Sequence, residues 1–368
     1  MDRFDVAVVG GGVVGLFTAL NLAWSGYSVV VVEEMERVMG GVSARSANVI
    51  HVLQTPFSSL KSRLCVEGNR LHYRLSPELG YRVVEAPLIL AYRERYKAPA
   101  AAAVARLLPR LIPKPLHEPS GPEIRVAHVK GPMLRDLEPG LSDDVLGGVV
   151  VHGYGVVDYS GLSSSLEKRV RRLGEILVSS PLTSAEERSG WMVLEAGEST
   201  LASRAVVNAA GLKSHLVARL LGDRVPEQTP VRGVMSLHRR PRLRSIVAPL
   251  ELRRGETKGG GAIPQADGSL LLGPNNAGPT VIGDESYTRE DLEWLRLRFQ
   301  PLLAEAVEEP DRVVVGLRPV APGRDFLVVR GRGRAVHLVG IESPGLTAAP
   351  ALAVRVARVV DELLGGRR

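Results

Sequence analysis

A glycine-rich turn near the N-terminus has residue types and spacing suited to binding a phosphate group. Residues 10–15 read GGGVVG, which fits the pattern G-x-G-x-x-G. In this pattern Gly10 permits a tight turn, Gly12 lets the backbone approach a pyrophosphate, and Gly15 allows close packing of a helix. The helix that follows offers unpaired N–H groups and the positive end of its dipole to the anion. We therefore predict a dinucleotide site at this turn.

The elements on either side of the turn predict a βαβ unit. Residues 5–9 (DVAVV) and 28–32 (SVVVV) are apolar runs typical of buried strands, and residues 13–24 have helical apolar spacing. Glu33 ends the second run, about 20 residues after the turn, where a carboxylate accepts hydrogen bonds from a ribose. A glycine-rich turn without a ligand is the alternative, and the complete βαβ context argues against it.

One histidine and one arginine elsewhere in the chain have contexts that suit catalysis. His51 ends the apolar segment VIH, and an imidazole takes up a proton near neutral pH. Arg318 follows a predicted strand at residues 313–317 and precedes a proline. A guanidinium there can hold a phosphate or carboxylate through two parallel hydrogen bonds. The alternatives are a core histidine bonded to backbone and an arginine in a surface ion pair.

The composition is that of an ordinary globular protein. The chain has 368 residues, of which 45% are hydrophobic and 24% charged, so it predicts two domains and excludes disordered, collagen-like and coiled-coil chains. Cys65 is the single cysteine, which excludes an internal disulfide and predicts a core position, and no Cys/His cluster has the spacing of a metal site. The net charge is +7, but basic residues are scattered and only 4% of residues are aromatic, so nucleic-acid binding is not predicted.

Nothing in the hydropathy pattern predicts a membrane-spanning protein. No apolar run approaches the roughly 20 residues needed, and the N-terminus lacks the pattern of a signal peptide, so we expect a soluble cytoplasmic protein. Residues 98–115 carry Arg106, Arg110 and Lys114 among Ala and Leu. They suit either a solvated surface helix or a basic helix in peripheral contact with a membrane. Three prolines in this stretch argue against a long helix.

The segments further along the chain predict an α/β fold with a second, α+β domain. Residues 175–179, 205–208 and 336–341 are apolar runs that suit the parallel sheet of the βαβ unit. The Pro-rich stretches between them contain alternating patterns, such as residues 269–272, that suit an antiparallel sheet. We predict a Rossmann-like nucleotide-binding domain with a parallel sheet (residues 1–75, 148–222 and 335–368) and a discontinuous substrate domain built on an antiparallel sheet (residues 76–147 and 223–334).

Motifs spread over nearly the whole chain resemble the D-amino-acid-oxidase-like (DAO) family of FAD-dependent oxidoreductases. The similarity is greatest to the branch of glycerol-3-phosphate oxidases and dehydrogenases and L-2-hydroxyglutarate dehydrogenases. The more specific motifs are VIH, GLRP and GIESPGLTAAP, ending at His51, Pro319 and Pro350. The more common ones are SARSAN, SLKSRLCVE, LEP, GVVDY, NAAG, RG and GSLLLGP, which begin at residues 43, 59, 137, 155, 208, 232 and 268. The resemblance implies that the bound dinucleotide is FAD.

The resemblance also implies roles for individual polar residues. In that branch the residue matching His51 takes the substrate hydroxyl proton as hydride leaves for flavin N5, and the residue matching Arg318 holds the substrate anion. Lys258 matches a lysine of compact glycerol-phosphate oxidases and would assist with the anion, the alternative being a solvated loop lysine. Ser343 would touch the substrate.

The turn SPGLT at residues 343–347 precedes a predicted helix and, by resemblance, faces the N1/O2 edge of the flavin. Capping of that helix by Ser343 or Thr347 is a compatible alternative. The chain departs from the family pattern at Ser46, Ala47 and Asn48, where the family usually has Asn-Ser-Gly. The predicted FAD-binding residues are Gly10, Gly12, Val13, Val14, Gly15, Glu33, Glu34, Ser43, Ser46, Ala47, Asn48, Leu182, Ala209, Ala210, Gly211, Arg318, Ser343, Pro344, Gly345, Leu346 and Thr347.

These observations predict an FAD-dependent oxidoreductase that oxidises a secondary alcohol of a small anionic substrate. Glycerol 3-phosphate, giving dihydroxyacetone phosphate, is the first candidate, and L-2-hydroxyglutarate or another 2-hydroxyacid is the alternative. An amine or amino-acid oxidase comes third, and a flavoprotein acting on RNA or a structural flavin-carrying subunit remain further hypotheses. Because the sequence ends soon after the last predicted helix, without a cysteine-rich segment, we expect electrons to pass to oxygen, a quinone or a partner protein.

Overall fold

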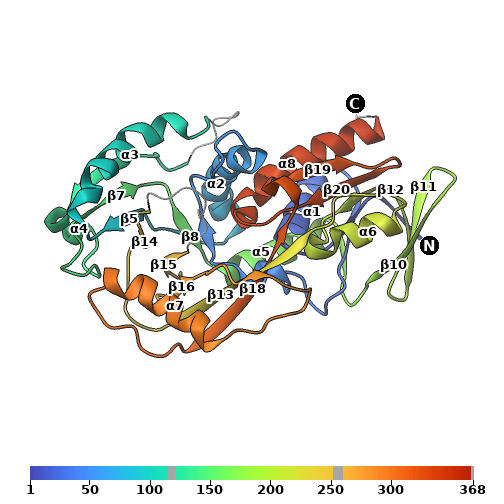
Figure 1. Cartoon of the computed structure of the whole chain (residues 1–368). Coiled ribbons are helices and arrows are strands. Elements are labelled where there is room, and N and C mark those ends of the chain that lie inside the picture. Colours follow the sequence, from blue (N-terminus) through green and yellow to red (C-terminus); the bar gives the residue numbers. More distant parts are fainter. Residues whose placement is uncertain (115–120, 252–259, 366–368) are drawn as a thin grey trace.

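The computed structural model describes residues 1–114, 121–251 and 260–365. The predicted residue Lys258 lies outside these described residues. Within them the strands form three sheets, and Figure 1 shows the two larger sheets in different halves of the molecule. The chain crosses between the halves several times, as expected for the predicted α/β fold with a second, antiparallel domain.

The first sheet is built on the predicted βαβ unit. Strands β1 (Asp2–Val9) and β2 (Val29–Val32) are parallel neighbours joined by helix α1 (Val13–Trp24), which confirms the unit. Each of the three segments predicted to extend this sheet does so in parallel. They are β9 (Glu175–Leu177), β12 (Ser199–Asn208) and β20 (Ala335–Val339).

Antiparallel strands extend the first sheet beyond β12, whereas its opposite edge is the parallel strand β9. Strands β10 (Leu182–Arg188) and β11 (Trp191–Ala196) form a hairpin that continues into β12. Strand β19 (Leu327–Arg330) pairs with β20, although the predicted boundaries give residues 223–334 to the substrate domain. The pairing follows from the short connection of residues 331–334, which suits a hairpin better than a change of sheet.

Helices cover both faces of the first sheet. On one face lie α1 and three further helices: α2 (Leu60–Leu79), α5 (Tyr159–Leu173) and α8 (Gly345–Leu364). The other face is covered by α6 (Ser214–Leu220), whose Val217 belongs to the same buried apolar cluster as Val9 and Val30. Helices α2 and α8 touch at Gly68, where an added Cβ would lie 2.0 Å from the carbonyl oxygen of Thr347. Cys65 on α2 is fully buried, as predicted, and burial raises the pKa of its thiol.

The second sheet is largely antiparallel, and most of its strands come from the two predicted substrate-domain segments. Its longest pair is β13 (Thr229–His238) with β18 (Arg312–Val320). The other strands are β5 (Leu88–Tyr92), β6 (Val126–Lys130), β7 (Gly147–Val151), β14 (Ile246–Pro249), β15 (Gly261–Pro264), β16 (Leu270–Gly273) and β17 (Gly278–Pro279). Strand β7 pairs with β5 and β6 here, whereas the predicted boundary places residues 148–222 in the nucleotide-binding domain.

Three helices and a small sheet complete the second half. Helix α7 (Arg289–Phe299) begins with a capping box between Thr288 and Asp291 and buries Phe299. The others are α4 (Gly131–Leu137) and α3 (Ala98–Leu111), and β3 (Val49–Ile50), β8 (Gly155–Val157) and β4 (Val83–Glu85) form the small sheet. Helix α3 runs through Pro109 to its last turn, further than its prolines suggested. No helix within the described part of the chain is both long and apolar enough to cross a membrane.

Candidate active site

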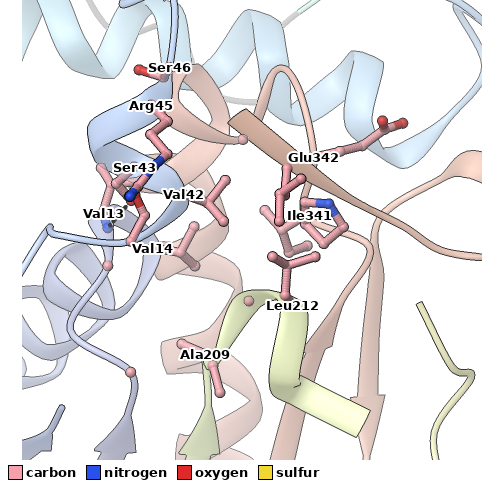
Figure 2. A pocket seen from close by; sticks show the side chains of 18 of the residues that line it. Val13, Val14, Val42, Ser43, Arg45, Ser46, Ala209, Leu212, Ile341 and Glu342 are labelled. Atoms are coloured by element: carbon pink, nitrogen blue, oxygen red, sulfur yellow. Dashed lines mark hydrogen bonds between the residues drawn. The ribbon is translucent and has the colours of Figure 1, made fainter. Parts of the chain in front are cut away.

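A cavity of about 710 Å³ gathers nearly all of the predicted site residues. It lies at the carboxyl ends of the parallel strands, where α/β sheets bind their ligands, and extends to strands β13 and β18 of the second sheet. Of the predicted residues that the structure describes, all line this cavity except Gly15, which lies behind the glycine turn. Figure 2 shows Val13, Val14 and Val42 facing Leu212 and Ile341 across it.

The glycine turn is shaped by two positions that have no room for a side chain. Gly10 has φ +105°, and a Cβ there would lie 2.6 Å from the carbonyl oxygen of Ala209. A Cβ on Gly15 would lie 1.9 Å from the carbonyl oxygen of Gly10. The turn therefore brings the start of α1 directly against the ends of β1 and β12, and a pyrophosphate can approach its backbone.

Ser43 stands at the N-terminus of α1, where the predicted pyrophosphate site lies. The N-cap residue of α1, Gly12, has no side chain that could accept an N–H group of the first turn. The Ser43 hydroxyl accepts the N–H of Val13 at 3.0 Å instead. Ser43 belongs to a short 3-10 helix, Val42–Arg45, and Figure 2 shows it beside Val13. While it accepts from Val13, the hydroxyl can still donate its own hydrogen to an anion.

Glu33 is held in one orientation by backbone groups. One carboxylate oxygen accepts the N–H of Gly11 at 2.6 Å and the other accepts the N–H of Met35 at 2.9 Å. The residue is buried, and each oxygen keeps capacity for a further hydrogen bond from a ribose. Glu34 next to it is exposed and pairs with Lys213 at 2.8 Å, a cavity residue that the sequence reasoning missed.

The segment that departs from the family pattern is tied to the second sheet. The Ser46 hydroxyl donates to the Asn48 side chain at 2.9 Å, and Asn48 donates to Gln265 at 2.9 Å. Asn48 has φ +59°, a backbone conformation that asparagine tolerates better than most residues. These side-chain groups are therefore engaged with the protein, while Ala47 between them also lines the cavity.

The His51 ring is oriented by a carbonyl and a hydroxyl. Its Nδ1 lies 3.2 Å from the Val49 carbonyl oxygen and 3.4 Å from Thr347 Oγ1. The Thr347 hydroxyl donates to the same carbonyl at 3.0 Å and accepts the backbone N–H of His51 at 3.1 Å. Because a carbonyl only accepts, Nδ1 carries the hydrogen in the neutral ring, and the basic lone pair is on Nε2.

The Arg318 side chain fits over a glycine of the neighbouring strand. A Cβ on Gly233 would lie 2.4 Å from a terminal nitrogen of Arg318, so only glycine leaves room for the guanidinium. One terminal nitrogen donates to the Asn275 carbonyl, which fixes the fork in the cavity wall. Burial lowers the pKa of Arg318, whereas the Glu342 carboxylate raises it. The guanidinium remains charged because its ordinary pKa is far above neutral.

The turn at residues 343–347 places the start of α8 against the cavity. The N-cap of this helix is Pro344, without a side-chain hydrogen bond, so the alternative that Ser343 or Thr347 caps the helix is wrong. The Thr347 hydroxyl donates to the Val49 carbonyl and accepts the N–H of His51. Ser343 is exposed at the cavity wall. In the first turn the Gly345 N–H donates to the Glu342 carbonyl, and the N–H groups of Leu346 and Thr347, without intrahelical acceptors, suit a partial negative charge.

Two further ion pairs at the cavity join residues that are too far apart in the sequence for local patterns to connect them. Arg45 lies 2.5 Å from Glu285, and both line the cavity. Lys61 lies 3.3 Å from Glu342, and both side chains are about 3% exposed. Lys61 and Glu342 lie in motifs that carried the family resemblance, yet nothing in the sequence indicates that they meet.

Comparisons with known proteins agree with this geometry. A family model described as FAD dependent oxidoreductase matches residues 5–359. The chain is 23% identical to a glycerol 3-phosphate dehydrogenase of Caloramator mitchellensis, over 98% of this chain and 74% of that protein. It is 27% identical to a mitochondrial L-2-hydroxyglutarate dehydrogenase of Nematostella vectensis, over 74% of this chain and 62% of that protein.

Solved structures of similar fold include enzymes with different substrates. L-alpha-glycerophosphate oxidase of Mycoplasma pneumoniae, solved with FAD bound, has a TM-score of 0.82 and 20% identity, covering 100% of this chain and 96% of that one. Glycine oxidase of Geobacillus kaustophilus has a TM-score of 0.81 and 22% identity, covering 100% and 96%. At these identities the likeness establishes the fold and leaves the substrate to be argued from the site.

Proposed function

The chain belongs to the family of FAD-dependent oxidoreductases, and from this premise we propose that it oxidises a secondary alcohol of a small anionic substrate. Glycerol 3-phosphate, giving dihydroxyacetone phosphate, is the first candidate. One observation carries the proposal: an oriented imidazole, His51, and an arginine fork, Arg318, line the same cavity as the glycine turn.

The residues of the chain fit the FAD that its family uses. The Cβ-free turn at Gly10 and Gly15 leaves the backbone open to a pyrophosphate, Ser43 adds a hydroxyl, and Glu33 adds a fixed carboxylate for a ribose. The start of α8 would lie at the flavin ring. When bound, FAD supplies the acceptor for the hydride that leaves the substrate carbon.

His51 is the proposed base. Its Nδ1–H is directed to the Val49 carbonyl, so Nε2 is the atom that takes the hydroxyl proton. Thr347 holds the same carbonyl and the His51 backbone, which limits rotation of the ring. A base fixed in one orientation loses less entropy on reaching the reactive geometry.

Arg318 is the proposed anion holder. Its guanidinium is confined between Gly233 and the Asn275 carbonyl, and its remaining N–H groups can bind two oxygens of a phosphate or carboxylate. Such bonds are stronger in a partly buried site than in water. We propose that Ser343, exposed at the same wall, contacts the substrate, and Lys258 remains a proposed second anion contact.

L-2-hydroxyglutarate is the second candidate, because one relative of this chain is an L-2-hydroxyglutarate dehydrogenase at 27% identity. It would use the same base, with a carboxylate at Arg318 in place of a phosphate. The acceptor that reoxidises the enzyme is proposed to be oxygen, a quinone or a partner protein. The division into a nucleotide-binding and a substrate domain is likewise a proposal, with β7 and β19 assigned by their sheets.

The test is anaerobic reduction of the FAD-loaded enzyme by each candidate substrate. The loss of flavin absorbance measures the reduction. Glycerol 3-phosphate should bleach the flavin rapidly, and L-2-hydroxyglutarate slowly or not at all. Bleaching by L-2-hydroxyglutarate alone would favour the second candidate. Bleaching by glycine or other amino acids, with no response to either hydroxy compound, would show that the proposal is wrong.

A further inference from the structure

The cavity is lined by several carboxylates, which would repel an anionic substrate. Its net charge therefore depends on which groups balance these carboxylates. Four of the lining residues within the described ranges carry carboxylates: Glu33, Glu34, Glu285 and Glu342. The first is bound to backbone N–H groups beside the glycine turn, and the next two are exposed and paired with Lys213 and Arg45.

Glu342 is different because it is buried and acts on Arg318. Only 5% of its surface is exposed, and it immediately precedes Ser343 at the cavity wall. Glu342 and Arg318 line the same cavity, and the negative charge of Glu342 acts on the Arg318 guanidinium against the effect of its burial. A carboxylate in this position competes with a substrate anion for the guanidinium and offers an acceptor to a substrate ammonium group.

Lys61 removes this competition. Its Nζ lies 3.3 Å from Glu342 Oε1 and also donates to the Arg324 carbonyl. The Lys61 backbone is fixed too, because Asp325 accepts the N–H groups of Leu60 and Lys61 at 2.8 and 2.9 Å. With Lys61 in place, its positive charge balances Glu342, and the charge of Arg318 is left over for a ligand.

Stability does not explain this arrangement. A buried ion pair is often no more stable than apolar side chains of the same size, because both ions lose their water. A lysine in the first turn of a helix is also unfavourable, since the helix dipole is positive there, and Lys61 is the second residue of α2. The pair is therefore better explained by the charge that it sets in the cavity.

We propose that Lys61 determines substrate specificity. By engaging Glu342 it leaves Arg318 to the phosphate or carboxylate of the substrate, and the charge of Glu342 is balanced and does not attract an ammonium group. The enzyme therefore takes anionic hydroxy compounds in preference to zwitterionic amino acids, although amino-acid-oxidising proteins share its fold. This inference rests on the proposed function, whose site it deepens.

The experiment measures binding of inorganic phosphate to the FAD-loaded enzyme by calorimetry, in parallel with anaerobic flavin reduction. Lys61→Met should weaken phosphate binding about tenfold or more, because Glu342 then pairs with Arg318. Glu342→Gln should bind phosphate at least as tightly as the wild type. The double variant, Lys61→Met with Glu342→Gln, should recover most of the loss, and Lys61→Arg should behave like the wild type.

Lys97→Met is the matched control, since it removes a lysine from an ion pair with Glu94 away from the cavity. It should leave phosphate binding unchanged. A merely structural role for Lys61 predicts that the double variant is as impaired as Lys61→Met, and that result would overturn the inference. If Lys61→Met does not fold, Glu342→Gln decides, because weaker phosphate binding by that variant contradicts the inference.

The outcomes separate this inference from the proposed function. If the wild type is bleached by hydroxy compounds but Lys61→Met binds phosphate normally, the role of Lys61 is wrong and the proposed function stands. If the wild type is bleached by amino acids and by no hydroxy compound, both are wrong.

Discussion

The glycine-lined end of the cavity is built from backbone, whereas the end with His51 and Arg318 is built from single side chains. At the first end, the backbone of the glycine turn packs closely on itself and on Ala209, and the shape requires that Gly10 and Gly15 have no Cβ. At the second end, two side chains from distant segments are each held by a carbonyl, that of Val49 or of Asn275. The first end should therefore fail when backbone shape changes, and the second when a side-chain group changes.

The largest effect should come from Gly15→Ala, which breaks the backbone-built end. The new Cβ would lie 1.9 Å from the Gly10 carbonyl oxygen, so the turn must shift. We expect a preparation with almost no bound FAD and a loss of about 1–3 kcal/mol in the free energy of unfolding. The flavin-to-protein absorbance ratio and a urea titration measure the two.

Gly190→Ala is the control for this change, because Gly190 has φ +80° with no atoms within 4 Å of an added Cβ. It should cost about 1–2 kcal/mol of stability and leave the FAD content unchanged. Full FAD content in Gly15→Ala would refute the steric account of the turn.

The next effect should come from His51→Gln, which changes one group at the side-chain-built end. Glutamine keeps a similar size and hydrogen bonding but has no base that titrates near neutral pH. Anaerobic flavin reduction should slow by about 10²–10⁴-fold, with normal FAD content and thermal midpoint. Reduction at the wild-type rate with the true substrate would rule out His51 as the base.

The third prediction concerns the loss of stability at low pH. We expect protonation of His72 to destabilise the nucleotide-binding half. The ring is fully buried. Its Nδ1 lies 3.0 Å from the Tyr81 hydroxyl, and its Nε2 lies 2.9 Å from the carbonyl oxygen of Leu346, at the start of α8. Burial lowers its pKa from 6.5 to about 4. The unfolded chain therefore binds a proton at higher pH than the folded one, and stability is lost as pH falls through this window.

Between pH 6.5 and about 4 the free energy of unfolding should drop by about 3 kcal/mol from this group, with no contribution from it above pH 6.5. Urea titrations at a series of pH values give the slope. His72→Gln should be flatter over the same range, and an equal slope in both proteins would contradict the assignment.

The smallest effect should come from Arg318→Ala. Unlike Gly15→Ala, this change should affect substrate binding and not FAD binding. Loss of the charge-assisted hydrogen bonds should weaken binding of substrate or inorganic phosphate by about 10- to 100-fold. The FAD content should stay near that of the wild type, because the glycine turn is untouched. Inhibition by phosphate that is as strong as in the wild type would remove Arg318 as the anion holder.

The same contrast explains how far the sequence could predict the molecule. The βαβ unit, the parallel strands and the glycine turn depend on neighbouring residues, so periodicity and spacing indicate them. The cavity residues of the other end followed from the family resemblance. The pair of Lys61 and Glu342 spans 281 positions, and no local pattern encodes such a contact.

The differences between the predictions and the structure also have physical causes. Strand β7 reads GGVVV, a continuous buried run that looks the same in either sheet, so its assignment to the nucleotide-binding segment could not be tested before the pairing was known. Helix α3 continues through Pro109 because that residue lies in the last turn, where a missing N–H costs one bond. Thr347 does not cap α8, because its hydroxyl donates to the Val49 carbonyl and accepts the N–H of His51 instead.

The order of strands in the first sheet has a consequence for synthesis on the ribosome. Strand β1 is among the first segments to emerge, but its neighbour β12 and the covering helix α8 come from much later in the chain. At about 5–20 residues per second, Val6 and Val8 can pack with α1 early but wait tens of seconds for α8. The cavity that Ala209 and the 343–347 turn help to line is therefore complete only late in translation, and we expect the nascent chain to depend until then on chaperones that mask apolar strands.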